Sequence, residues 1–173
     1  RDCLLSRGLG DVYKRQMSTK EIKWTMFVIA AIGNFIAMLD STTVNLALYP
    51  MSVDLNVSMG EIQWVMVAYM LVLTVFLPFF GKLGDIFPKN KLYSLGFLIF
   101  AIGAFLNTTA PSFVLLVSYR CLEALGASIM LSNAQAIIAS IFKNERRGKA
   151  LGLNGCIVAI GGMSGPALGG ILI

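Results

Sequence analysis

The stretch Gly152–Gly170, GLNGCIVAIGGMSGPALGG, decides the fold of this chain. It carries no charged residue, yet it is too rich in glycine and proline for an ordinary soluble helix. In hydrocarbon an unpaired backbone polar group is so costly that a helix persists despite glycine. Because Gly161, Gly165 and Gly169 recur every four residues, they line one flank of that helix. We therefore expect a membrane-spanning helix that a neighbouring helix approaches closely.

The composition of the whole chain is that of a membrane protein. Hydrophobic residues make up 57%, charged residues 13%, and the mean hydropathy is +0.76. A typical soluble domain is less apolar and more highly charged. We expect an all-α integral membrane bundle, because about 20 apolar residues are needed to cross ~30 Å of hydrocarbon. The expected spans are residues 24–48, 62–80, 93–110, 113–142 and 150–173.

The positive charges predict the topology of these spans. Lysines and arginines lie before the first span, between the second and third, and between the fourth and fifth, whereas the connections 52–61 and 107–112 have none. Positive residues favour the cytoplasmic side. We expect a multi-pass protein of the cell membrane with a cytoplasmic N-terminus, and we do not read the net charge of +5 as affinity for nucleic acid.

The first residues do not fit this pattern. Arg1–Gln16 lacks an initiator Met, mixes charges and has too short an apolar run for a signal peptide. We interpret residues 1–16 as a non-native leader and Met17 as the start; the alternative is a genuine cytoplasmic arm.

Metal, disulfide and catalytic signatures are missing from the sequence. Cys3, Cys121 and Cys156 fit no metal-ligand spacing and no disulfide framework, and there is no histidine. We see no nucleophile elbow and no phosphate-binding loop. The sequence predicts neither an enzyme nor a bound cofactor or metal, and carboxylates are the candidate proton carriers.

Three charged residues lie inside the apolar spans. Such residues are rare and usually functional. At 1.5 Å per residue, Asp40 lies about 24 Å along the first span and Arg120 about 10 Å along the fourth, which runs in the opposite direction. The two are therefore at similar depth and can pair directly or through water. Glu123 shares a face with Arg120 about one turn deeper. The alternative for Asp40 is a polar group satisfied by a neighbouring helix, with no role in transport.

The glycine-rich stretch resembles the antiporter motif in the fifth helix of the major facilitator superfamily. The matching positions are Gly152, Gly161, Gly165, Pro166, Gly169 and Gly170. The family associates this motif with drug:proton exchangers. The alternative is a generic face of small residues for helix packing, since such patterns are common in membranes.

The first span resembles the first-helix signature of the 14-helix drug:proton antiporter branch. The matching residues are Asp40, Thr42, Val44, Asn45 and Ala47. Tyr49 stands where that branch has proline, and Pro50 comes one residue late.

The segment RCLEALGAS resembles the fourth-helix signature of proton-coupled members. Arg120 and Gly126 match, whereas Glu123 replaces the usual glutamine and Ala124 the usual glycine. Glu123 is either an additional protonatable site or a structural partner of Arg120.

The segment Gly81–Leu92, GKLGDIFPKNKL, resembles the superfamily's loop between helices two and three. Gly81, Leu83, Gly84 and Asp85 fit, while Ile86, Pro88 and Asn90 depart from the pattern. In the family this loop acts as a gate, so the resemblance implies a gating role for Gly81, Gly84, Asp85 and Lys89. Asp85 can also cap a neighbouring helix. The alternative is that the lysines simply hold the loop in the cytoplasm.

Together the resemblances imply a proton-coupled antiporter that exports small lipophilic or cationic compounds by alternating access. The chain would be an N-terminal fragment with about five of roughly 12 to 14 helices. Asp40 and Glu123 would bind the proton beside Arg120, and the fifth helix would seal against the other half of the protein. The alternatives are an uptake symporter for a metabolite and a non-transporting membrane sensor. Expected partners are a small-molecule substrate, protons and the lipid bilayer, but no nucleic acid; a periplasmic adaptor is left open.

Overall fold

The regular structure of the chain is helical. The computed structural model describes residues 2–142 and 145–172, with side chains for 23–142, 147–167 and 169. Within these residues the expected all-α class is confirmed. The helices are α1 Asp2–Asp54, α2 Met59–Ile62, α3 Trp64–Ile86, α4 Lys89–Asn107, α5 Phe113–Ile141 and α6 Glu145–Leu172.

Five of the described helical segments are long and apolar enough to cross a membrane. They are Lys23–Asp54, Met59–Ile86, Lys89–Asn107, Phe113–Ile141 and Arg147–Ala167. At 1.5 Å per residue each can cover most or all of the ~30 Å hydrocarbon core. The chain is therefore a multi-pass membrane protein.

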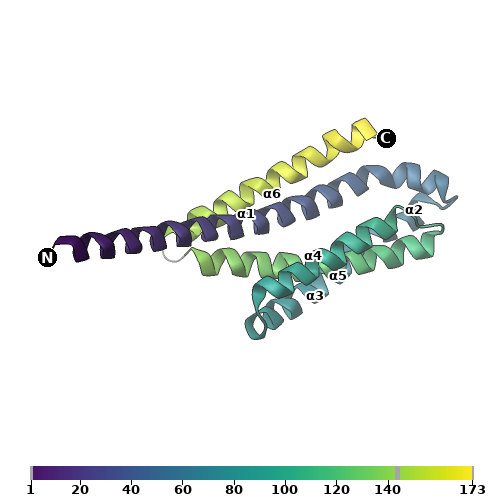
Figure 1. The fold of residues 1–173 in the computed structure, drawn as a ribbon. Coiled ribbons are helices and arrows are strands. Elements are labelled where there is room, and N and C mark those ends of the chain that lie inside the picture. The colour runs from purple at the N-terminus through teal and green to yellow at the C-terminus, as the bar shows by residue number, and fades with distance from the viewer. Residues whose placement is uncertain (1, 143–144, 173) are drawn as a thin grey trace.

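Helix α5 is the centre of the bundle. It packs against α4, α3 and α1, whereas α6 packs mainly along α1. Figure 1 shows the resulting arrangement, with α1 and the yellow α6 side by side and α3, α4 and α5 forming a second group. Contacts between α1 and α5 join the two groups, and the candidate site lies at this junction.

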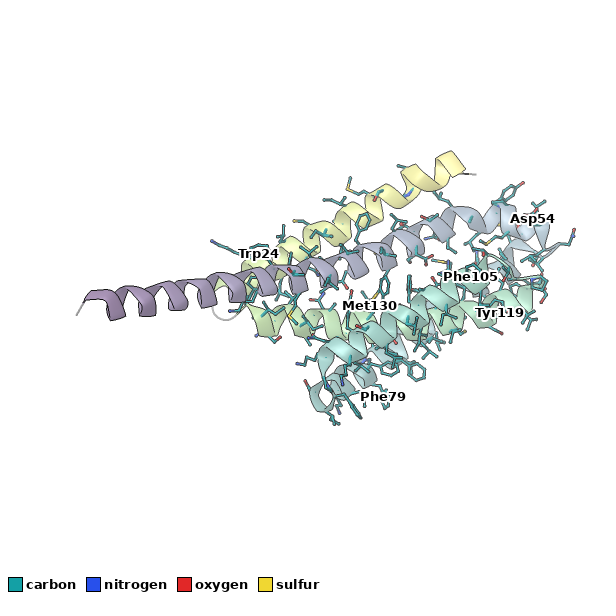
Figure 2. All side chains as sticks on the ribbon, viewed as in Figure 1. Trp24, Asp54, Phe79, Phe105, Tyr119 and Met130 are labelled. Atoms are coloured by element: carbon teal, nitrogen blue, oxygen red, sulfur yellow. The ribbon has the colours of Figure 1, made fainter. Side chains whose placement is uncertain are left out.

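Two apolar clusters hold α1 against the second group. At one end Trp24 and Phe27 of α1 meet Phe142, with ring centroids 5.7–5.8 Å apart in edge-to-face contact. At the other end Val44 of α1 is buried with Leu116 of α5. In Figure 2 the labels Trp24 and Asp54 mark the two ends of the apolar part of α1, Lys23–Asp54, and the label of the fully buried Met130 lies between them.

The connection after α1 is shorter than expected. Helix α1 continues through Pro50 to Asp54, and α2 begins at Met59, so 52–61 is not an open loop. Ser58 and Glu61 form a capping box, with the Ser58 backbone N–H donating to Glu61 Oε2 over 2.9 Å. The spacing Ser-x-x-Glu carries this signal in the sequence.

The expected loop at residues 81–92 is wrong in its extent. Helix α3 continues to Ile86, and α4 begins at Lys89, which leaves only Phe87 and Pro88 between them. Phe87 is extended, with φ −101° and ψ 157°. A residue before proline is pushed out of the helical region, so Pro88 explains where α3 ends.

The basic segment before the last span is also mostly helical. Helix α6 begins at Glu145, so Arg147 and Lys149 lie in its first turns rather than in a loop; residues 143–144 lie outside the described part. At the other end of the chain, α1 begins at Asp2. The interpretation of residues 1–16 as a non-native leader stays a prediction.

Candidate functional site

Arg120 of α5 joins the two intramembrane carboxylates. Its Nη1 donates to Asp40 Oδ2 of α1 over 2.8 Å and to Glu123 Oε2 over 2.8 Å. The pairing expected from the depths of Asp40 and Arg120 is therefore present. Glu123 is a second partner of the same nitrogen, so the three side chains form one ionic cluster, which we call the charge cluster.

A third helix, α4, reaches the charge cluster through Asn107. This residue ends α4, and its Nδ2 donates to Glu123 Oε2. Helical side chains lean towards the N-terminus of their helix, so Asn107 reaches back to the level of Gly103. At that level an added Cβ on Gly103 would lie 2.7 Å from the Glu123 backbone.

Tyr69 of α3 covers the guanidinium group. The Arg120 Cζ lies 5.5 Å from the centroid of the Tyr69 ring, which is within the range of a cation–π contact. Side chains from α1, α3, α4 and α5 thus converge on the charge cluster. Glu123 is completely buried and the Arg120 side chain is 4% exposed, whereas the Asp40 side chain is 24% exposed. Asp40 is therefore the accessible member of the charge cluster.

The charges of the cluster do not cancel when all three groups are ionised. Arg120 contributes one positive charge, and Asp40 and Glu123 contribute one negative charge each. Burying an unpaired charge is costly, whereas hydrogen-bonded opposite charges offset much of that cost. Binding one proton, or one positive group, would make the charge cluster neutral.

Metal ligation has no support in the described side chains. No group of three His, Cys, Asp or Glu among them could hold a metal ion. Cys121 and Cys156 are free thiols. The chemistry that the charge cluster offers is exchange of protons, hydrogen bonds and charge.

Three glycines bring α4 against α5 next to the charge cluster. An added Cβ at Gly96 would lie 2.9 Å from the Met130 nitrogen, and one at Gly126 would collide with the Phe100 nitrogen. Gly103 meets the Glu123 backbone in the same way. We call Gly96, Gly103 and Gly126 the α4–α5 seam. It fixes the distance between Asn107 and Glu123.

The glycine flank of α6 packs against α1. An added Cβ at Gly161 would lie 2.9 Å from the Phe35 carbonyl oxygen, and one at Gly169 would lie 3.1 Å from Leu46 Cδ1. Gly165 fits against the Thr42 hydroxyl. Helix α1 of this same bundle therefore occupies this flank, and the expectation that the fifth helix seals against the other half of the protein stays a prediction.

The remaining motif positions lie differently. Gly152 has no atom within 4 Å of an added Cβ, and Pro166 is exposed inside α6. The surroundings of Gly170 lie outside the described residues.

A buried amide pair also ties α6 to α1. Asn34 Nδ2 donates to Asn154 Oδ1 over 3.0 Å, and both side chains are at most 2% exposed. Hydrogen bonds between polar side chains hold membrane helices together. The pair lies at the same α1–α6 contact as the glycine flank and therefore fixes the register of these two helices.

The residues of the expected gate lie in the last turns of α3 and the first turn of α4, on either side of the turn at residues 87–88. Gly84 packs on the buried Asn133 of α5, whereas Gly81 has no atom within 4 Å of an added Cβ. Asp85 and Lys89 form an ion pair at 3.6 Å, with the Asp85 side chain 74% exposed. Asp85 does not cap α4, because Pro88 occupies the N-cap position without a side-chain bond.

The sequence prediction missed several side chains at these contacts: Tyr69, Asn107, Asn34 and Asn154. Tyr69 looks like an ordinary aromatic near a membrane interface, and Asn107 like the polar end of a span. Asn34 and Asn154 carried a usable signal, because an amide in the middle of an apolar run needs a partner.

Comparison with known proteins covers most of this chain. A model of the Major Facilitator Superfamily matches residues 30–173. The riboflavin transporter RibZ of Clostridioides difficile is 44% identical over 151 residues, 87% of this chain and 33% of that protein. Multidrug resistance protein 3 of Bacillus subtilis is 30% identical over 150 residues, 86% of this chain and 29% of that protein. The chain spans about a third of the length of these curated relatives.

A solved structure shows the same arrangement of helices. It is the crystal structure of a bacterial homolog of the human lysosomal transporter Spinster, with a TM-score of 0.78 and 20% sequence identity. The match covers 87% of this chain and 32% of that one. At this identity the likeness concerns the fold alone.

Proposed function

We propose that this chain, which belongs to the Major Facilitator Superfamily, is the N-terminal part of a transporter that moves a small molecule by alternating access. The observation that carries the proposal is the charge cluster, in which Arg120 links α1 to α5 within the spanning segments. Intramembrane charges of this kind mark the paths of ions and substrates.

A metabolite is the first candidate substrate. The relative named a riboflavin transporter is more similar to this chain than the relative named for multidrug resistance. This difference favours the alternative drawn from the sequence, uptake of a metabolite, over export of drugs. Riboflavin is therefore the first compound to test.

Drug export remains a second candidate. It is supported by the complete glycine motif and by relatives named for resistance, which include the methylenomycin A resistance protein of Bacillus subtilis. The 14-helix branch and a preference for cationic lipophilic compounds belong to this candidate alone.

Proton coupling is the mechanism that the charge cluster supports. Asp40 is the accessible carboxylate and Glu123 the buried one, and both bind the same Arg120 nitrogen. One proton neutralises the cluster, and its loss restores a net negative charge. If one conformation of the protein is stable only when the cluster carries this proton, then binding and release of the proton shift the protein between its conformations.

The glycine motif and the gate residues support the motion. Gly161, Gly165 and Gly169 make α1 and α6 a closely packed pair that can move as one body. Asp85 and Lys89 lie at the α3–α4 turn, where the exposed Asp85 is available to a partner helix when the gate closes. Gly81 and Gly84 belong to the same turn region on the last turns of α3.

The positive charges support a cytoplasmic N-terminus in the cell membrane. Lys82, Lys89 and Lys91 lie at one end of the bundle, with Arg147 and Lys149 in the first turns of α6. The turn at residues 108–112 between α4 and α5 has no Lys or Arg. This bias supports a cytoplasmic location for the α3–α4 turn.

Transport by the full-length protein in vesicles with an imposed pH gradient tests the proposal. Riboflavin and a lipophilic cationic dye are offered separately, and proton movement is followed with each. Movement of riboflavin coupled to protons supports metabolite uptake; movement of the dye against protons supports drug export. No movement of either compound, beyond that of vesicles without protein, contradicts both candidates.

Two arginine variants assign the effect to the charge cluster. Arg120→Gln removes the charge that joins Asp40 to Glu123, and we expect transport to be lost. Arg120→Lys keeps the charge and checks that the loss is not a folding defect. Arg147→Gln removes an exposed arginine of α6 and serves as the matched control. Equal transport by Arg120→Gln and Arg147→Gln would remove Arg120 from the mechanism.

A further inference from the structure

Two buried oxygen atoms beside the charge cluster have no hydrogen-bond donor. They are Oε1 of Glu123 and Oδ1 of Asn107. The same two side chains are already joined by one hydrogen bond, from Asn107 Nδ2 to Glu123 Oε2. An acceptor buried without a donor costs about 1–3 kcal/mol, so two of them in one contact need an explanation.

A single proton placed between the two oxygens would satisfy both atoms. An ionised carboxylate can only accept hydrogen bonds, and so can the oxygen of a carboxamide. A protonated carboxyl group has one O–H donor. If the proton sits on Oε1, it can donate to Asn107 Oδ1, and the carboxyl and carboxamide groups are then joined by two antiparallel hydrogen bonds.

The charges around Glu123 also favour a proton on this residue. Arg120 of α5 and Asp40 of α1 are the charged groups of the cluster, and Tyr69 of α3 covers the guanidinium. One arginine cannot neutralise two carboxylates, and Glu123 is the one with no exposed surface. A proton on Glu123 leaves Arg120 and Asp40 as a neutral ion pair.

We propose that Glu123 carries a proton in this conformation and that Asn107 is the positioning residue that holds it, through a two-way hydrogen bond between carboxylic acid and carboxamide. The inference rests on the proposed function, because it names the proton site of that transporter. The step is simple addition of a proton to a carboxylate: Oε1 gains the hydrogen, and no other bond changes.

The position of Asn107 links this proton to the conformation of the protein. Asn107 is the last residue of α4, next to the turn that leads to α5. When the proton leaves Glu123, one of the two hydrogen bonds is lost, and the outer end of α4 is held less firmly against α5. The α4–α5 seam, with Gly103 against the Glu123 backbone, keeps the two groups in reach for the return of the proton.

Infrared difference spectroscopy of the full-length protein in lipid tests this assignment. The carbonyl stretch of a protonated carboxylic acid is separate from that of a carboxylate, and its position reports the hydrogen bond to the acid. We expect an acid band near neutral pH that disappears in Glu123→Gln. In Asn107→Leu the band should shift, because the O–H donor loses its acceptor; Asn107→Gln, which keeps the carboxamide, should restore part of the shift.

A matched control lies on the same helix. Asn90 is an exposed asparagine in the first turn of α4, so Asn90→Leu makes the same chemical change away from Glu123 and should leave the band in place. A band that disappears in Asp40→Asn instead of Glu123→Gln would overturn the assignment to Glu123. A band that Asn107→Leu does not move would overturn the role of Asn107.

The absence of any acid band would mean that Glu123 is ionised and that a water molecule donates to the two oxygens, which would also overturn the proposal. The spectrum requires no transported substrate. Failure of the proton assignment is therefore distinguishable from failure of the proposed transport function.

Discussion

The two closely packed helix pairs of this bundle use their glycines differently. In the α4–α5 seam, Gly96, Gly103 and Gly126 all lie against backbone atoms of the facing helix. In the α1–α6 pair, Gly161 meets a backbone carbonyl, whereas Gly165 and Gly169 meet mainly the side chains of Thr42 and Leu46. The stretch with the most glycines is thus not the one with the closest contacts to backbone atoms.

The difference teaches that a glycine matters through what faces it. A backbone atom cannot move away from an added methyl group without shifting its helix, but a side chain can rotate. The α4–α5 seam also positions Glu123 and Asn107, so a substitution that displaces the two helices changes the geometry of the charge cluster. The open glycines of α6, such as Gly152, carry neither constraint within the described residues.

The largest effect is expected in the α4–α5 seam. In Gly126→Ala the new Cβ collides with the Phe100 nitrogen, and the facing helix must shift. We expect a loss of about 1–3 kcal/mol in the free energy of unfolding, as for other overpacked sites. Unfolding of the full-length protein in mixed micelles measures it. A loss no greater than that of Gly155→Ala, whose added Cβ has nothing within 4 Å, would show that the seam can relax.

A smaller effect is expected in the glycine flank of α6. In Gly165→Ala the new Cβ meets the Thr42 hydroxyl, which can rotate, and it lies 2.8 Å from the Thr42 Cβ and 3.2 Å from the Leu39 carbonyl oxygen. We expect a loss of about 1 kcal/mol in the free energy of unfolding, at the lower limit for overpacking. The double variant Gly165→Ala with Thr42→Ala tests the cause: removal of the Thr42 hydroxyl should recover part of the loss. An effect as large as that of Gly126→Ala would erase the difference between the two pairs.

The amide pair between α1 and α6 should contribute less again. In Asn154→Leu the Asn34 amide loses its 3.0 Å partner. Interhelical hydrogen bonds in membranes contribute about 0.6 kcal/mol on average, so we expect a coupling free energy of that order between the two amides. A double-mutant cycle with Asn34→Leu measures the pair itself. Strictly additive losses would show that the two amides do not stabilise each other.

The smallest effect is expected at the open end of α6. Gly152→Ala adds a methyl group with no atom within 4 Å, and alanine favours a helix by up to about 1 kcal/mol over glycine. We expect unchanged or slightly higher stability of the full-length protein. A marked loss would instead show that a segment outside these residues covers Gly152.

The sequence predicted the features that depend on one helix at a time. The apolar runs gave the membrane class, and the depths of Asp40 and Arg120 placed the two charges at the same level. The i, i+3 spacing likewise put Glu123 on the face of Arg120. These inferences need only helix geometry and the thickness of the bilayer.

Contacts between neighbouring helices could not be predicted from the geometry of single helices. Asn107 lies where a polar helix end is ordinary, and only the approach of α4 to α5 shows its contact with Glu123. The glycine flank of α6 was visible, but the helix that it faces was not. The ends of α3 and α6 were misplaced because glycine and basic residues do not stop a helix at a membrane surface, whereas the proline at position 88 does.

The central claim is that the charge cluster couples protons to transport. The most direct test is to measure proton-coupled transport by the Asp40→Asn variant. The variant keeps the size and one hydrogen-bond acceptor of Asp40 but removes its charge, and Asp85→Asn makes the same change at an exposed ion pair. With whichever compound the full-length protein moves, we predict that Asp40→Asn loses the dependence of transport on the pH gradient while Asp85→Asn keeps it. Unchanged proton-driven transport in Asp40→Asn would contradict the account.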